Sequence, residues 1–375
     1  MVSRRTLSVC LTGFIVLSVS AAACAQQKAA ASPKEPERQV ITVTGFGDPV
    51  DKSYRKMTSG MDLFESKRAM APAAALRFRL LPRRKDTTMK LIDLEVVGET
   101  FAIPVPLAPD NTFTLDRIRK AWDDDASVQA NRKALTMTWR ADIRTPGLPP
   151  HTRRLGDLRL ECEVGFEAGL ISNAPGIGGL FGIRRDHCNR LRPRYLFFAE
   201  KPLFGVTLTA GGRTEVLPAY MLYASALDHP MSKRELAHCD CEVLLDRAYF
   251  LPLGDRSWPD DTLVEFEYMD DERVTAKTVA TGNVKALSVQ STIAVGKSTK
   301  ADVIATLGKS MVLAFESGLE VWAYRFKDPS EETQPARSKD PPQPPPRETE
   351  LVVLFAPSGI ATKTRMGLAA AVDEN

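Results

Sequence analysis

The chain has 375 residues, of which 43% are hydrophobic and 26% are charged, and its formal net charge is +3. This is the composition of an ordinary globular protein, and the length suffices for two or three domains with their own cores. So small a net charge gives no general electrostatic attraction to nucleic acid, and we expect no nucleic-acid partner.

Residues 1–23 have the three parts of a secretory signal peptide. A basic start, MVSRR, precedes the apolar run TLSVCLTGFIVLSVS and the small residues AAACA, a pattern that predicts export. Two alternative cleavage sites fit this pattern. The Ala-x-Ala pattern ending at Ala25 would release a soluble chain, whereas the preceding residues resemble a bacterial lipobox that would leave Cys24 as a lipidated first residue.

Four cysteines follow Cys24, namely Cys162, Cys188, Cys239 and Cys241. An even number of cysteines in an oxidising compartment favours two disulfides. A bond between Cys239 and Cys241 would be strained, because a single residue separates them. We therefore expect Cys162 and Cys188 to bond to Cys239 and Cys241, in either order.

The same cysteines admit a second interpretation, a zinc site. His187 precedes Cys188, and His238 precedes Cys239, so that two clusters could together supply four ligands to tetrahedral zinc. Their spacing is not a standard zinc spacing, and exported thiols tend to oxidise. We therefore favour disulfides, keep free thiols as a third alternative, and predict no metal or other cofactor.

Residues 24–39 are rich in alanine, proline and charge, which predicts a flexible tether. Residues 40–165 are expected to form a β-rich domain with one helix. Tyr54, Met57, Met61 and Phe64 recur at helical steps and predict that helix.

Strands are predicted in this domain from apolar residues that alternate with charged ones. Residues 76–80 alternate in this way, and two further strands are expected on either side of Gly98. The stretch LRLECEV at 158–164 shows the cleanest alternation, so we expect a strand with Cys162 pointing inward.

Residues 166–285 predict a second β-rich domain that holds the expected disulfides. Its strands are expected at YLFFA, FGVTLTA, GGRTEVLPAYMLYA, CEVLLD and LVEFEYM. Short alternating strands joined by glycine and proline turns indicate that each of the two β-rich domains is sandwich-like.

This second domain contains a basic loop at 183–194. Its arginines are candidates for contact with the anionic groups of lipid A or peptidoglycan, since guanidinium donors match such groups. They are Arg184, Arg185, Arg190, Arg192 and Arg194. The alternative is an ordinary solvated surface.

Residues 286–375 begin with a short predicted helix. Thr299 and Asp302 fit a capping box at its start, and Gly308 fits its end. Two strands follow, EVWAYRFK and LVVLFAPSG. Between them, residues 328–349 are too rich in proline and charge to fold, so we expect a disordered excursion that joins the two strands.

Nine residues of this region follow one another in the stretches GKSTKADVIATLG, GLEVWAYRF and FAPSG. They are Gly296, Thr299, Val303, Leu307, Gly308, Trp322, Tyr324, Phe355 and Gly359. In this order they resemble the BamE/SmpA/OmlA family of outer-membrane lipoproteins, over about residues 288–366. The resemblance implies a small two-layer α/β domain, with helices on a three-stranded antiparallel sheet. It also implies a non-enzymatic role in supporting the machinery that inserts β-barrels. Residues 40–285 carry no such resemblance.

Motifs of catalysis are few. The sequence has no Gly-x-Ser-x-Gly elbow and no His-Glu-x-x-His, and a single Ser-x-x-Lys at Ser53 is a match expected by chance. The sequence therefore predicts an α+β protein, mainly β, with two β-sandwich-like modules followed by the small α/β domain.

We expect a non-enzymatic exported cell-envelope protein. It would be an adaptor or scaffold in the periplasm or at the inner face of the outer membrane, with outer-membrane assembly proteins as partners. One alternative is a module that binds glycan, peptidoglycan or lipopolysaccharide. Another is a zinc-dependent envelope enzyme.

Overall fold

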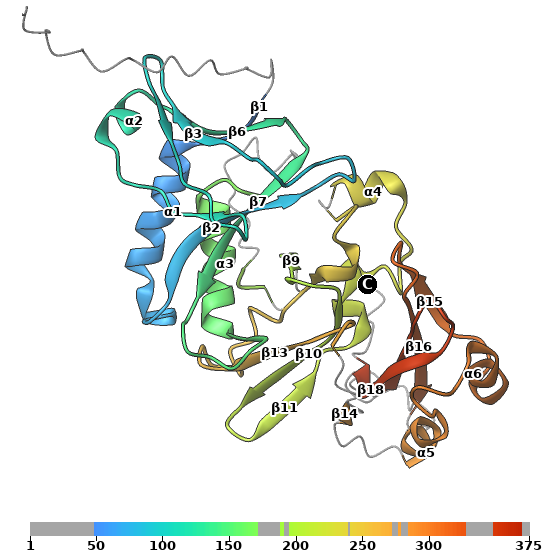
Figure 1. Ribbon diagram of the computed structural model, residues 1–375. Helices are drawn as coiled ribbons and strands as arrows, with labels where there is room; N and C mark the ends of the chain where they lie inside the picture. The colour runs from blue at the N-terminus through green and yellow to red at the C-terminus, as the bar shows by residue number, and fades with distance from the viewer. Residues whose placement is uncertain are drawn as a thin grey trace, which may run out of the picture. The chain divides into compact units, whose positions relative to one another are not determined.

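The computed structural model of the chain describes residues 49–171, 188–190, 195–238, 241–271, 277–278, 284–327 and 348–369 (Figure 1). All of them lie within one compact unit, Gly45–Asn375. The predicted signal peptide, the lipidation candidate Cys24 and the tether lie outside the described residues. Within the described residues, no helix is both long and apolar enough to cross a membrane.

The described residues form a mixed α/β structure in which strands predominate, with 36% strand and 23% helix. Several sheets are antiparallel, so the predicted class, α+β and mainly β, is confirmed at this level. The arrangement as two sandwich-like modules stays a prediction.

Helix α1 (Tyr54–Ser66) forms where the apolar stripe predicted it. Ser53 is its N-cap, and the Ser53 side chain accepts a hydrogen bond from the backbone N–H of Lys56. The helix buries Tyr54, Met57 and Phe64 in the N-terminal core, so the stripe serves packing.

Two sheets share this core with α1. The first has the order β1 (Pro49–Ser53), β6 (Ser127–Lys133), β3 (Leu94–Val97) and β4 (Ala102–Pro104). The second has the order β5 (Thr112–Phe113), β2 (Ala75–Pro82) and β7 (Met137–Arg144). The pair of strands expected around Gly98 is confirmed, and β4, which contains Pro104, lies at the sheet edge.

The strand expected at residues 158–164 is wrong, since these residues belong to helix α3 (Leu155–Glu167). Arg159 and Glu161, which suggested an exposed strand face, are buried in ion pairs with Asp260 and Arg153. A helix that is buried on nearly all sides shows no amphipathic period, so its sequence does not reveal it. With α1 and α2 (Arg119–Asp123) also present, the expectation of one helix in residues 40–165 is wrong as well.

The middle of the chain contains a four-stranded sheet and a two-stranded one. The larger has the order β11 (Arg213–Val216), β10 (Leu203–Ala210), β13 (Leu263–Tyr268) and β8 (Thr152–Arg154). The smaller pairs β12 (Ala248–Tyr249) with β9 (Phe197–Phe198). Two predictions fail here. The strand expected at GGRTEVLPAYMLYA ends at Val216, and the chain beyond Pro218 forms the short helices η3 (Ala219–Met221) and η4 (Tyr223–Ser225). The stretch CEVLLD forms turns and the start of η5 (Leu245–Arg247) instead of a strand.

The C-terminal region has helices α5 (Val284–Thr292) and α6 (Lys300–Leu307) and a five-stranded sheet. The sheet order is β14 (Lys277–Thr278), β18 (Ala361–Ala369), β17 (Glu348–Phe355), β16 (Glu320–Lys327) and β15 (Met311–Ala314). The expected three-stranded sheet is therefore too small, because the short edge strands β14 and β15 extend it.

Strands β16 and β17 pair antiparallel with Lys327 opposite Glu348. The two strands that flank the proline-rich segment are thus direct neighbours. The expected disordered excursion, 328–349, is too long by two residues, because Glu348 and Thr349 belong to β17; residues 328–347 lie outside the described residues.

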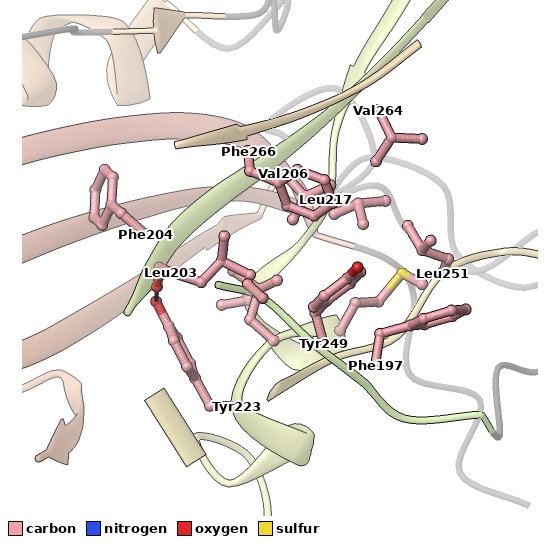
Figure 2. Packing of buried hydrophobic residues seen from close by; sticks show 14 of the residues in the cluster. Phe197, Leu203, Phe204, Val206, Leu217, Tyr223, Tyr249, Leu251, Val264 and Phe266 are labelled. Carbon is pink, nitrogen blue, oxygen red and sulfur yellow. Dashed lines mark hydrogen bonds between the residues drawn. The ribbon is translucent and has the colours of Figure 1, made fainter. Parts of the chain in front are cut away.

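The largest core cluster joins the middle of the chain to the C-terminal sheet. Leu203, Val206 and Val264 lie in it, as Figure 2 shows, and so do Val321 and Leu354 of the C-terminal strands. Leu155 and Cys162 of α3 also belong to it. The three predicted domains, 40–165, 166–285 and 286–375, therefore contribute to one shared core.

Candidate functional site in the C-terminal region

The apolar residues of the C-terminal motif converge between the helices and the sheet. Val303 from α6, Trp322 and Tyr324 from β16, and Phe355 from β17 lie in one buried cluster, and Leu307 packs against it. The rings of Trp322 and Phe355 have centroids 4.6 Å apart. These motif residues therefore form the joint core of the two layers.

The polar and glycine residues of the motif shape its turns. Thr299 and Asp302 form the predicted capping box of α6, and Gly308 is the C-cap. Gly296, Gly308 and Gly359 have φ of +80°, +76° and +80°, which glycine adopts without strain.

The first and last glycines of the motif lie beside the same turn. The Gly296 N–H donates to the Ala361 carbonyl at 2.8 Å, and the Lys300 N–H donates to the Gly359 carbonyl at 3.1 Å. The turn before α6 is thereby fixed to the turn between β17 and β18. All nine motif residues thus have a local structural role around one small α/β unit.

The sheet face opposite α5 and α6 is not free. Val321, Ala323, Val352 and Leu354 lie in the core cluster shared with β10 and β13. Both faces of the C-terminal sheet are therefore covered by the protein itself. Three large apolar side chains of the described part of this region are exposed: Ile304 on α6 (49%), Val312 on β15 (51%) and Leu368 on β18 (44%).

Two buried charges lie on this covered face. The Arg365 guanidinium donates from Nε to the Phe204 carbonyl at 3.1 Å and from Nη1 to the Leu217 carbonyl at 2.9 Å. Glu350 Oε1 accepts a hydrogen bond of 2.7 Å from the Ala219 N–H. These bonds join β17 and β18 to the middle of the chain.

The environment of Glu350 favours its neutral form. Burial raises the pKa of the Glu350 carboxyl above its ordinary value, although Arg365, the Ala219 N–H and Arg325 all act in the opposite direction. Arg325 itself pairs with Asp228 at 2.7 Å and lies 3.6 Å from Glu350 Oε2. Glu350 is therefore a buried titratable group held between the two regions.

A second buried ionic cluster lies where α3 meets β7 and β8. Arg153 Nη2 donates to Glu161 at 2.6 Å and to the Ile143 carbonyl at 2.6 Å. Burial alone would raise the pKa of nearby Asp142, but the charges of Arg153, Arg79 and Arg144, with a hydrogen bond from Arg144, lower it. Each of these acids faces an arginine, which is the arrangement of structural ion pairs.

The disulfide prediction is wrong in its pairing. Cys162 bonds to Cys188, with their Cα atoms 5.9 Å apart, and not to Cys239 or Cys241. Cys241 is buried, and Cys239 lies outside the described residues. The Cys162–Cys188 bond ties α3 to the second predicted domain, a tie that the inward position of Cys162 allows.

The zinc alternative falls mostly on residues whose positions are not described, namely His187, Cys239 and the side chain of His238. Cys188, which is described, has its sulfur in the disulfide and so is not a thiolate ligand. No cluster of three or more metal-binding side chains occurs in the described part of the chain.

The structure places only one of the five candidate anion-binding arginines, because Arg184, Arg185, Arg192 and Arg194 lie outside the described residues. Arg190 is exposed. Sequence reasoning missed Glu350 and Arg365. The available clue was a charged residue inside an otherwise apolar strand, as in ETELVVLF, because such a residue needs a buried partner.

Comparisons with known protein families, with curated proteins and with solved structures found no match for this chain.

Proposed function

We propose that the chain is a non-enzymatic, exported cell-envelope protein that works as an adaptor or scaffold at the inner face of the outer membrane or in the periplasm. The proposal is supported by the packing of the nine motif residues. They join helix α6 to a sheet in which β15, β16, β17 and β18 pair antiparallel, and this packing supports the resemblance to BamE-type lipoproteins. Outer-membrane assembly proteins are the proposed partners.

One face of the C-terminal sheet is covered by the protein itself and is not accessible to a partner. Val321 and Val352 are buried against the middle of the chain, so docking on that face would require breaking a core. The exposed side chains Ile304 and Val312 lie on α6 and on the edge strand β15. We therefore assign partner docking to α6 and β15.

Capture from cells tests this function. The tagged chain is expressed in the bacterium that encodes it, the cells are fractionated, and cross-linked proteins are identified by mass spectrometry. We expect the chain in the envelope fraction, together with outer-membrane assembly subunits. An Ile304→Glu variant should lose them, whereas Trp122→Glu, at another exposed apolar residue outside the C-terminal region, should keep them. A cytoplasmic chain, or equal capture by both variants, would contradict the proposal.

A further inference from the structure

Two neighbouring loops expose leucine side chains at their tips. Leu91 is 92% exposed and Leu135 is 66% exposed. Single exposed leucines are common on protein surfaces and need no explanation. These two differ because both have a left-handed backbone, with φ of +53° and +63°, a conformation that glycine or asparagine adopts at lower cost. At both positions an apolar side chain is exposed to solvent on a strained backbone. Strained backbone conformations of this kind cluster at functional sites.

The loop at residues 83–93 lies beside residues 131–136, which are the end of β6 and the turn that follows it. These two segments are called the leucine loops below. Arg132 binds the first loop through three of its carbonyls, donating to those of Thr88, Lys90 and Leu91. The Thr87 hydroxyl donates to the Thr136 carbonyl at 2.9 Å. The two leucines are therefore carried on one joined surface.

This surface is basic. The leucine loops contain six basic residues and two acidic ones, and the basic ones are Arg83, Arg84, Lys85, Lys90, Arg132 and Lys133. Lys90 directly precedes Leu91, and Lys133 lies two residues before Leu135; both lysines are exposed. Among the described residues no ion pair involves either of these lysines, whereas Arg84 pairs with Asp86 and Lys85 with Glu316.

We propose that the leucine loops are a membrane-contact site, in which Leu91 and Leu135 enter the acyl layer while Lys90 and Lys133 bind anionic lipid headgroups. Exposed apolar tips framed by lysine and arginine match the two parts of such a surface, since the tips bury apolar area and the cations meet negative charge. The inference goes beyond the proposed adaptor function, because the site lies outside the C-terminal region and does not depend on its partner.

Vesicle co-sedimentation tests the proposal with the purified full chain carrying Cys24→Ser, so that no lipid on that cysteine contributes. The probes are vesicles of phosphatidylcholine, with and without phosphatidylglycerol. We expect binding to the vesicles that contain phosphatidylglycerol, little binding to the neutral ones, and loss of binding at high salt.

Three variants separate the two parts of the site. Leu91→Asn with Leu135→Asn should weaken binding by about a hundredfold, because each buried leucine contributes about tenfold. Asparagine tolerates the left-handed backbone, so the thermal midpoint should be unchanged or higher. Lys90→Gln with Lys133→Gln should weaken binding by about fivefold per lysine. The control Ile304→Asn, at an exposed residue elsewhere, should bind like the parent chain.

Absence of binding to the phosphatidylglycerol vesicles would overturn the proposal, as would equal binding by the parent and the double leucine variant. A chain that fails this test but still captures outer-membrane assembly subunits would leave the adaptor function standing. Conversely, a chain that binds the vesicles but captures no such subunits would contradict only the adaptor function.

Discussion

At the scale of single residues, the structure shows acids that are buried for different reasons. Glu161 faces Arg153 in a closed ion pair at 2.6 Å, whereas Glu350 accepts a backbone N–H and lies 3.6 Å from Arg325. Sequence alone could not distinguish the two, because both acids are adjacent to apolar residues in the chain. The partner of Glu161 comes from β8, directly before α3, whereas Ala219, the partner of Glu350, is distant along the chain.

Removing one charge of the Arg153–Glu161 pair should lower the stability of the folded protein. Glu161→Gln leaves Arg153 as a buried charge without its carboxylate, and we expect a loss of about 3 kcal/mol in the free energy of unfolding. Urea denaturation of the purified protein measures this loss. The control is Glu65→Gln, which removes a solvent-exposed pair with Arg68 and should cost no more than about 0.5 kcal/mol. Similar losses of unfolding free energy in both variants would show that the buried pair contributes no more to stability than the exposed one.

Glu350 predicts a pH dependence. Its pKa is raised in the folded protein, so the folded state favours the protonated carboxyl. The resulting stability is fully present below the unfolded pKa and is lost as the pH rises through the folded pKa. Glu350→Gln keeps a neutral side chain, so its stability should fall less than that of the wild type between about pH 4 and about pH 8. Parallel curves of unfolding free energy against pH for the two proteins would contradict the raised pKa.

At the scale of elements, prediction succeeded where one face of an element meets the core and the other meets solvent. Helix α1 and strand β13 follow their sequence periods, since Phe64 and Phe266 are buried while their polar neighbours are not. It failed for α3, because Arg159 and Glu161 are buried in ion pairs and imitate an exposed strand face. Element identity there depends on tertiary contacts that periodicity does not contain.

The capping box of α6 gives a test at this scale. Thr299→Ala removes the side-chain acceptor for the Asp302 N–H, and we expect a loss of about 1 kcal/mol in the free energy of unfolding. Thr299→Ser keeps a hydroxyl and should lose much less. Chemical denaturation with both variants measures the difference. Equal stability of the alanine and serine variants would mean that the hydroxyl does not contribute.

At the scale of the whole molecule, residues from all three predicted domains pack in one core. The motif residues around Trp322 could be identified from their spacing, but the packing of Val321 and Val352 on the middle of the chain could not, because it depends on how distant surfaces fit. The disulfide shows the same limit. The even number of cysteines in an exported chain predicted correctly that Cys162 is bonded. Its partner is Cys188, which the cysteine count does not identify.

Loss of that disulfide should weaken the whole fold. The bond closes a loop with a sequence separation of 26 residues. Replacing both cysteines with alanine should lower the free energy of unfolding by about 3 kcal/mol, because the unfolded chain gains freedom. Denaturant titration checks the size of the effect, and peptide mapping without reductant checks the pairing. A peptide joining Cys162 to Cys239 or Cys241 would contradict the structure.

The central claim is that the C-terminal region docks a cell-envelope partner through α6 while its sheet face stays covered. Photo-cross-linking in cells tests it most directly, with a photoreactive amino acid placed at Ile304 or, as the control, at Trp122. We predict a cross-link from position 304 to an outer-membrane assembly protein and none to such a protein from position 122. A chain that forms no envelope cross-link from position 304 would contradict the claim.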